Sequence, residues 1–164
     1  YPTPMRIGVV SDTHNRLSNV VRIVELFNAS GVDRVVHTGD ITQAKTLEVL
    51  AGLEAPLFGV YGNNDERAAL AEAATPLGIE LHDVPLYLDW ADRRIVVVHD
   101  PRDLETLPDP NWDLALHGHT HLRTETRHGE QLIFNPGECA GHLQGHNAIG
   151  VVDLLRLDTE ILLF

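Results

Sequence analysis

The chain has 164 residues, 43% of them hydrophobic, which is a usual size for one domain and enough apolar material for a core without disulfide support. Its formal net charge is −12 at pH 7, from 12 basic and 24 acidic side chains. This balance argues against general nucleic-acid binding, which needs a basic surface to neutralise phosphates. An acidic enzyme can still bind a phosphate ester if bound cations supply positive charge locally.

The single cysteine, Cys139, cannot form an intramolecular disulfide, and this favours a reducing, cytoplasmic environment. No stretch approaches the roughly 18 consecutive apolar residues of a membrane span, so we expect no membrane partner. Residues 1–4 lack the basic and apolar segments of a signal peptide, and we interpret them as an N-terminal extension or a cloning remnant. We therefore predict one domain over residues 5–164.

The first half of the chain alternates between strand-like and helix-like segments. Met5–Val10 is a short apolar run with β-branched residues, which is typical of a strand buried on both faces. The alternation predicts βαβ units and a largely parallel sheet. The predicted strands are Met5–Val10, Asp33–Val36 and Pro56–Tyr61; the predicted helices are Leu17–Asn28, ended by Gly31, Thr42–Leu53, capped by Thr42, and Glu66–Ala74, closed by Pro76 and Gly78.

The second half consists of short strand-like segments with tight turns, which predicts mostly antiparallel pairing. Residues Arg127–Glu130 resemble a hairpin turn, and Pro101–Pro110 is expected to be the longest loop. The predicted strands are Ile79–Leu81, Val84–Trp90, Arg94–Val98, Leu114–His117, Arg123–Arg127, Gln131–Phe134, Ala148–Leu154 and Thr159–Leu163.

Polar side chains follow several predicted strands at the point where each strand ends. Ligands of open α/β sheets gather beyond the carboxyl ends of the strands, so we expect these side chains at one edge. Each fragment alone is also typical of a polar turn or a helix cap, but their combination favours a metal site. The residues are Asp12 and His14 after the first strand, Asp40 after the second, Asn63 after the third, His99 after residues 95–98, and His119 and His121 after residues 114–116.

The mixture of side chains in this set indicates which ions it suits. Carboxylates, imidazoles and one amide favour divalent ions such as Mn²⁺, Fe²⁺, Zn²⁺ or Ni²⁺. The absence of cysteine from the set argues against a structural zinc site. Two ions about 3.5–4 Å apart need a bridging ligand, which an aspartate can supply with both oxygens. Alternating residues of Gly118–His121 can direct two imidazoles to different ions, and for the neighbouring His117 we favour a structural role.

Five motifs, taken in order, resemble those of the calcineurin-like metallophosphoesterases. They are Asp12-x-His14, Gly39-Asp40, Gly62-Asn63-x-Asp65, His99 and Gly118-His119-x-His121. The resemblance runs from Met5 to the end of the chain, and Asn135-Pro136-Gly137 is similar to a segment of the small single-domain bacterial and archaeal phosphodiesterases. The resemblance implies an α/β fold, a four-layer α/β/β/α sandwich with two mixed β-sheets.

The resemblance also implies two divalent metal ions, with Mn²⁺ the first choice. A hydroxide between the ions would attack phosphorus in line, and the ions would stabilise the developing charge. Asp40, as the bridge, and Asn63 would act in catalysis through the metals, with no independent general acid. The implied ligands are Asp12, His14, Asp40 and His121 for the first ion, and Asp40, Asn63, His99 and His119 for the second.

Three residues near these motifs depart from the family pattern. Asn64 stands where many larger members have a histidine that assists the leaving group, and an amide cannot act as a general acid near neutral pH. This favours activated or diester substrates and leaves Asn64 as a candidate substrate contact. Asp100 replaces the usual glycine after the fourth motif's histidine, and Glu138 replaces a small hydroxyl residue.

The leading functional hypothesis is a metal-dependent phosphoesterase, first of all a phosphodiesterase, acting on a small phosphate ester or nucleotide. The alternative is a metal-stabilised protein-interaction scaffold without turnover, because a metal-poor retromer subunit shares this fold. A nuclease would use the same chemistry, but the acidic balance lowers that hypothesis. The basic residues nearest to such a role are more typical of solvated surface positions; they are Arg102, Arg123, His142 and His146. The oligomeric state stays open.

Overall fold

Eleven strands and three α-helices build the part of the chain that the structure, a computed structural model, describes, namely residues 4–143 and 145–164. Residues 1–3 of the expected N-terminal extension lie outside the described residues. The elements are β1 (Arg6–Val10), α1 (Leu17–Ser30), β2 (Arg34–His37), α2 (Ala44–Leu50), β3 (Leu57–Val60), α3 (Arg67–Leu77), β4 (Glu80–His82), β5 (Leu86–Trp90), β6 (Arg93–Val97), the 3-10 helix η1 (Pro101–Thr106), β7 (Leu114–Leu116), β8 (Thr124–His128), β9 (Gln131–Asn135), β10 (Ala148–Asp153) and β11 (Asp158–Leu163).

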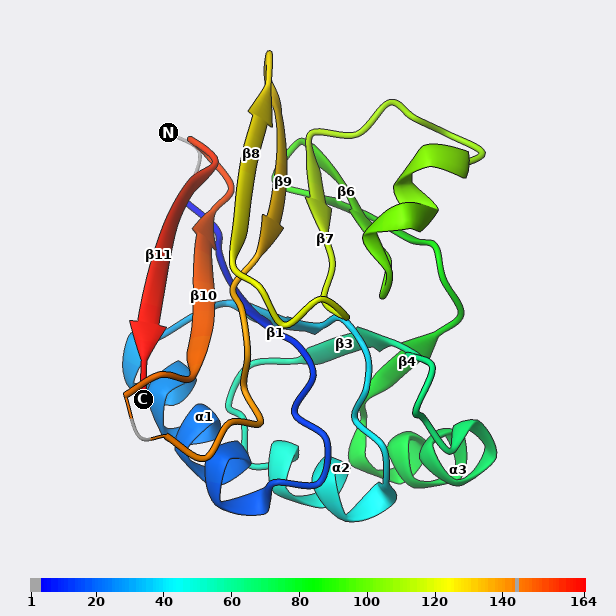
Figure 1. The fold of residues 1–164 in the computed structure, drawn as a ribbon, viewed down its shortest axis with the longest axis vertical. Helices are drawn as coiled ribbons and strands as arrows, with labels where there is room; N and C mark the ends of the chain where they lie inside the picture. Colours follow the sequence, from blue (N-terminus) through cyan, green and yellow to red (C-terminus); the bar gives the residue numbers. More distant parts are fainter. Residues whose placement is uncertain (1–3, 144) are drawn as a thin grey trace.

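The strands form two sheets, and the three α-helices lie together on one side of the larger sheet (Figure 1). The larger sheet has the strand order β11-β10-β1-β2-β3-β4, and the smaller sheet has the order β5-β6-β7-β9-β8. Both sheets contain parallel and antiparallel pairs. The predicted α/β fold with two mixed sheets is therefore confirmed. No helix among the described residues is long and apolar enough to cross a membrane.

Strand β1 is buried on both faces because it lies between the helices and the second sheet. Ile7 and Val9 belong to the core between the two sheets, whereas Val10 packs with Phe27 of α1 in the core under the helices. All four side chains are at most 1% exposed. Burying a side chain of this size contributes roughly 1.5–3 kcal/mol relative to leaving it exposed. This explains why the first strand of the sequence is apolar at successive positions.

The outer face of the smaller sheet is covered by η1 and the residues that follow it, not by an α-helix. Val96 and Val98 pack there against Leu104 and Trp112. The expectation that Pro101–Pro110 is an irregular loop was therefore wrong for its first six residues. Proline fits the first turn of a helix because its missing N–H is not needed there, and the Asp100 side chain caps the turn by accepting a hydrogen bond from the N–H of Arg102 at 3.0 Å.

The predicted boundaries of α3 and α2 were also wrong. Helix α3 continues through Pro76 to Leu77 and is capped by Gly78, whose φ of 72° is left-handed, and α2 ends at Leu50 rather than Leu53. A proline in the last turn removes only one N–H, and the glycine provides the actual stop. Thr42 does not cap α2, which begins at Ala44 after Gln43. Its backbone N–H instead donates to a carboxylate oxygen of Asp65 at 2.6 Å.

The strand directions bring the carboxyl ends of strands from both sheets to one region. Strands β1, β2 and β3 are parallel neighbours, as predicted. Strands β6, β7 and β9 are parallel to one another as well, so the prediction of mostly antiparallel pairing missed this part of the smaller sheet. Turn-like residues between short strands favour hairpins, but the segments from β6 to β7 and from β7 to β9 are long enough to cross over. The loops after β6 and β7 therefore open on the same edge.

Candidate metal centre

The loops after β1, β2, β6 and β7 meet where the two sheets present their carboxyl ends. Asp40, after β2, places its Oδ2 atom 3.3 Å from His99 Nε2 and 3.9 Å from His14 Nε2. Asp12, after β1, places its Oδ1 atom 3.9 Å from His121 Nε2. Five of the seven side chains that the sequence singles out thus come together at the expected edge.

Within this cluster, two groups of three side chains place their ligand atoms within 4.8 Å of one another. The first is Asp12, His14 and His121, and the second is Asp12, Asp40 and His99. Asp12 belongs to both groups, whereas Asp40 faces a histidine of each. Groups of this size and composition are what a divalent ion requires from a protein.

Two atoms of the cluster are buried without a hydrogen-bond partner among the described residues, and both point to a cation. They are Asp12 Oδ1 and His99 Nε2. The other oxygen of Asp12, by contrast, accepts hydrogen bonds from Ser11 Oγ and from the N–H of His119, each at 2.9 Å. An unpaired buried polar atom costs roughly 1–3 kcal/mol, so free lone pairs in this position fit a bound metal ion.

The facing atoms of His99 and Asp40 lead to the same conclusion. His99 Nδ1 lies 2.9 Å from the carbonyl oxygen of Thr38, so this nitrogen carries the proton and donates it. In the neutral ring, Nε2 then presents a lone pair to the carboxylate of Asp40 at 3.3 Å. Two acceptors at that distance need a proton or a metal ion between them.

The pKa values of this pair show the same demand for positive charge. Burial alone lowers the pKa of His99, but the neighbouring carboxylate of Asp40 outweighs burial and raises it. Burial alone raises the pKa of Asp40, but the facing imidazole of His99 and the N–H groups of Asn64 outweigh burial and lower it. Without a metal ion, a proton on His99 would fill this role.

His37 connects the first two ligand loops and was not assigned a role from the sequence. It is fully buried, and burial lowers its pKa to about 3, so the ring is neutral. The N–H of Gly39 donates to Nδ1 at 3.0 Å, which leaves the proton on Nε2, 2.9 Å from Thr13 Oγ1. His37 therefore bridges the segment before His14 and the segment before Asp40. A histidine at the end of a buried strand is the only sequence signal for it.

Asn64 and Asp65, both in the loop after β3, hold Asp40 in place. The backbone N–H and side-chain Nδ2 of Asn64 donate to the two Asp40 oxygens at 3.0 and 3.1 Å. Asp65 accepts the N–H groups of Gly62 and Asp40 through Oδ2, at 2.6 and 3.1 Å. The third motif therefore fixes the second motif through hydrogen bonds, which the spacing of the sequence did not reveal.

The backbone of the cluster is unusual as well. A residue other than glycine in the left-handed region costs roughly 1–2 kcal/mol and persists where the surrounding structure enforces it, often at functional sites. Five of the seven predicted ligands have such a backbone; they are Asp12 (φ 53°), His14 (47°), Asp40 (62°), His119 (69°) and His121 (59°).

Two motif glycines are required by close contact with these ligands. A Cβ atom at Gly62 would overlap the carboxylate of Asp40. A Cβ atom at Gly118 would lie 2.7 Å from Thr38 Oγ1 and 2.8 Å from Asp12 Oδ2, distances that real Cβ atoms do not show. The glycines therefore allow the four loops after β1, β2, β3 and β7 to approach one another closely.

The two remaining predicted ligands lie at the border of the cluster. The ring of His119 packs edge-on against the ring of His99, with 5.1 Å between the centroids, and belongs to neither group of three. Asn63 is exposed on the loop after β3, next to Gly62 and Asn64, which both lie against the Asp40 loop. His117 is 2% exposed and its Nδ1 lies 3.0 Å from the Gly118 carbonyl oxygen.

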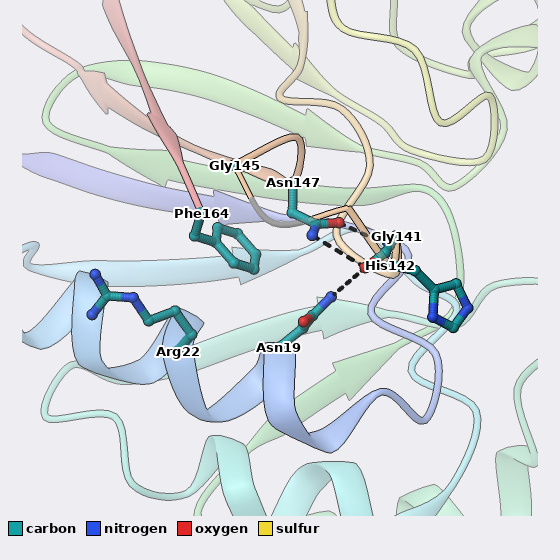
Figure 2. Close-up of a pocket in the computed structure, with 7 residues that line it drawn as sticks. All are labelled: Asn19, Arg22, Gly141, His142, Gly145, Asn147 and Phe164. Atoms are coloured by element: carbon teal, nitrogen blue, oxygen red, sulfur yellow. Dashed lines mark hydrogen bonds between the residues drawn. The ribbon is translucent and has the colours of Figure 1, made fainter.

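A separate pocket of about 490 Å³ lies between the start of α1 and the loop that leads into β10 (Figure 2). It is lined partly by His142 and by Phe164 at the end of the chain. Its amides face the loop rather than the cavity, because Asn19 and Asn147 both donate to the Gly141 carbonyl oxygen, at 3.1 and 3.2 Å. These two amides therefore hold the loop in place, and the pocket offers few free polar groups to a ligand.

Comparisons with known proteins show which family the chain belongs to. The family model of the calcineurin-like phosphoesterase superfamily domain matches residues 5–159. The chain belongs to this superfamily. A phosphodiesterase of Methanocaldococcus jannaschii is 34% identical over 154 residues, covering 91% of this chain and 93% of the relative. A phosphodiesterase of Escherichia coli is 28% identical over 151 residues, covering 83% of this chain and 80% of the relative.

A solved structure shows that the similarity includes the fold. The structure of an archaeal phosphodiesterase superposes with a TM-score of 0.88 at 32% identity, covering 98% of this chain and all of that chain (100%). The predicted resemblance to the calcineurin-like phosphoesterases is therefore confirmed. Members of this superfamily are hydrolases of phosphate esters that use divalent metals, and the clustered carboxylates and imidazoles of this chain are suitable ligands.

Proposed function

We propose that this calcineurin-like phosphoesterase is a phosphodiesterase that uses two divalent metal ions to hydrolyse a small phosphate ester or a nucleotide. The observation that carries the proposal is the position of Asp40 Oδ2, which faces His99 Nε2 at 3.3 Å and His14 Nε2 at 3.9 Å. One carboxylate oxygen between two imidazole nitrogens is the arrangement expected of a ligand shared by two ions. Relatives named phosphodiesterases, at 34% and 28% identity, support the reaction class.

We assign the bridging role to Asp40 rather than Asp12, although Asp12 belongs to both groups of candidate ligands. Asp40 Oδ2 faces a histidine of each group, His14 and His99, whereas Asp12 Oδ1 faces His121 and Asp12 Oδ2 is hydrogen-bonded to Ser11 and to the N–H of His119. We include Asn63 and His119 among the ligands because of their positions in the sequence motifs. The proposed ligands are Asp12, His14, Asp40 and His121 for one ion, and Asp40, Asn63, His99 and His119 for the other.

Two ions bound here would supply the positive charge that a phosphoryl group needs and would make a bound water molecule more acidic. The residues of the chain orient this centre. His99 is fixed by the Thr38 carbonyl, and Asp40 is fixed by the two N–H groups of Asn64. An amide cannot protonate a leaving group, so we propose diesters and activated esters as the substrates.

The metal, the substrate class and the compartment complete the proposal. We propose Mn²⁺, because oxygen and imidazole ligands without thiolate suit it. The net charge of −12 favours a small substrate over nucleic acid.

Cys139 is fully buried, and its Sγ donates to the Ala148 carbonyl at 2.9 Å. Burial raises its pKa to about 12, so it is an inert thiol. A lone reduced cysteine supports a cytoplasmic protein.

A hydrolysis assay tests the proposal. The metal-free protein is mixed with Mn²⁺, and release of nitrophenol is followed from bis(4-nitrophenyl) phosphate and from 4-nitrophenyl phosphate. We expect Mn²⁺-dependent turnover, faster on the diester, and loss of turnover in Asp40→Asn. The control Asp103→Asn changes an exposed aspartate on η1 and should retain full activity. Full activity in Asp40→Asn would show that Asp40 is not the bridge.

Two further measurements distinguish an enzyme from a metal-stabilised scaffold. Atomic absorption gives the metal content of the protein, and a panel of monoesters, diesters and cyclic nucleotides gives its turnover with each ion. A protein that binds stoichiometric metal but hydrolyses none of these esters would favour the scaffold.

A further inference from the structure

Each histidine of the Gly118–His121 segment has one ring nitrogen near a carboxylate that is not among the proposed ligands. The Nε2 atom of His121 faces Asp12, and its Nδ1 atom lies 3.6 Å from Oε1 of Glu138. The ring of His119 packs against His99, and its Nε2 atom lies 3.8 Å from Oδ2 of Asp100. One nitrogen of each ring is thus near one of these two carboxylates, and in His121 the other nitrogen faces the proposed ligand Asp12.

Both carboxylates lie next to segments that the sequence singles out. Asp100 directly follows the predicted ligand His99, and Glu138 directly follows the Asn135-Pro136-Gly137 segment. Neither residue has a catalytic role in the proposed function. Their contacts with neighbouring histidines therefore need a separate explanation.

Asp100 is held firmly in position. The guanidinium of Arg102 donates to both of its oxygens, with Nε at 3.1 and 3.0 Å and Nη2 at 2.6 Å. The side chain of Asp100 is 20% exposed, whereas that of Arg102 is 80% exposed and lies on the solvent side of Asp100. Glu138 is more exposed than Asp100, at 44%.

Resting on the proposed metal centre, we infer that Asp100 and Glu138 are the outer carboxylate partners of His119 and His121, one for each metal ion. Histidines that bind metal usually donate the N–H of their second ring nitrogen to a carboxylate or carbonyl, which orients the ring and makes it a better ligand. His99 has such a partner in the Thr38 carbonyl. Asp100 and Glu138 give the same support to His119 and His121 and act as positioning residues.

The two partners contribute unequally. At 3.6 and 3.8 Å the contacts are longer than direct hydrogen bonds, so charge attraction or a bridging water connects them. Asp100 is already ordered by Arg102, and little side-chain entropy is lost when it supports His119, although Arg102 offsets part of its charge. Glu138 is half exposed and more strongly screened by water. Asp100 should therefore have the larger effect.

Calorimetric titration of the metal-free protein with Mn²⁺ tests this inference. The wild type should show two binding events. Asp100→Asn should weaken one event about 10-fold, the lower end of the range for outer partners of metal ligands, and Glu138→Gln should weaken the other event by less. The control Glu105→Gln removes an equal charge from an exposed position on η1 and should leave both events unchanged. Circular dichroism establishes that each variant is folded.

Combining these substitutions with His119→Ala tests whether the effect of Asp100 on metal affinity depends on His119. In His119→Ala one binding event should remain; adding Asp100→Asn should not change it, whereas adding Glu138→Gln should still weaken it. A wild type without two binding events would contradict the proposed metal centre itself. Two events in the wild type with unchanged affinities in Asp100→Asn, or equal losses in Asp100→Asn and Glu105→Gln, would overturn the inference and leave the metal centre intact.

Discussion

The carboxylate of Asp65 holds the backbone of Asp40, with 3.1 Å between Asp40 N and Asp65 Oδ2. The same carboxylate accepts the N–H groups of Gly62 and Thr42, each at 2.6 Å. These N–H groups belong to the loops after β2 and β3, so Asp65 fixes the two loops relative to each other. The direction of the Asp40 carboxylate, and with it the proposed shared ligand, depends on this contact.

Replacing Asp65 by alanine should therefore damage both stability and the metal centre. Three backbone N–H groups lose a charged acceptor, which should cost about 2–4 kcal/mol in urea unfolding of the metal-free protein. Mn²⁺ affinity should fall about 10-fold because Asp40 is no longer held. Asp83→Ala, at an exposed aspartate paired with Arg67, is the control and should change stability by about 0.5 kcal/mol or less. Unchanged Mn²⁺ affinity in Asp65→Ala would remove Asp65 from this role.

Adding a single methyl group at Gly62 tests the close approach of the loops. The new Cβ atom would overlap the Asp40 carboxylate, so Gly62→Ala should lower Mn²⁺ affinity by at least about 10-fold and cost about 1–3 kcal/mol of stability. Gly129→Ala is a useful control, because a Cβ atom there meets nothing within 4 Å but suffers the strain of a φ of +60°. It should cost about 1 kcal/mol and leave metal binding unchanged. Equal metal affinities in the two variants would contradict the steric explanation.

Asn63 and Asn64 should respond differently to the same change. If Asn63 is a metal ligand, Asn63→Ala should abolish one of two Mn²⁺ binding events in calorimetry. Asn64→Ala removes one hydrogen bond to Asp40, of 3.1 Å, but keeps the backbone one of 3.0 Å. Losing this hydrogen bond should cost about 1 kcal/mol, which corresponds to a roughly five-fold lower affinity for Mn²⁺. Two intact events in Asn63→Ala would exclude it from the ligands.

The neutral His37 should make the metal-free protein sensitive to acid. Burial lowers its pKa to about 3, against 6.5 for an exposed histidine, so between these pH values the unfolded chain binds a proton that the folded chain does not. Its contribution to stability is complete above pH 6.5 and decreases as the pH falls towards 3. The free energy of urea unfolding should fall by about 2 kcal/mol between pH 8 and pH 5 because of His37. The His37→Asn variant should lack this part of the decrease.

The matched control for this pH dependence is His128→Asn, which changes an exposed histidine at the end of β8. This variant should lose stability between pH 8 and pH 5 as the wild type does. Chelator is present throughout, because a bound metal ion would add its own pH dependence. If His37→Asn loses as much stability as the wild type over this range, His37 is not held neutral in the fold.

The periodicity of the sequence predicted the elements well because it depends on local burial. Strand β1 is apolar at successive positions, and the structure places Ile7 and Val10 in cores on opposite faces of the sheet. The ends of elements were predicted less well, because they depend on partners far along the chain. Thr42 was expected to cap α2, but its backbone N–H is bound by Asp65, which is distant in the sequence.

The residue types of the site, their order and their places after strands were determined by the sequence alone, because strand ends and metal-ligand chemistry are both local properties. Tertiary structure decided which of them face one another. The parallel pairing of β6 with β7 placed His99 and the loop of His119 at one edge, and Asp65 directed Asp40 toward His14 and His99. It also placed Asp100 and Glu138 beside two histidines. No spacing in the sequence reports such contacts, because they join loops that are far apart along the chain.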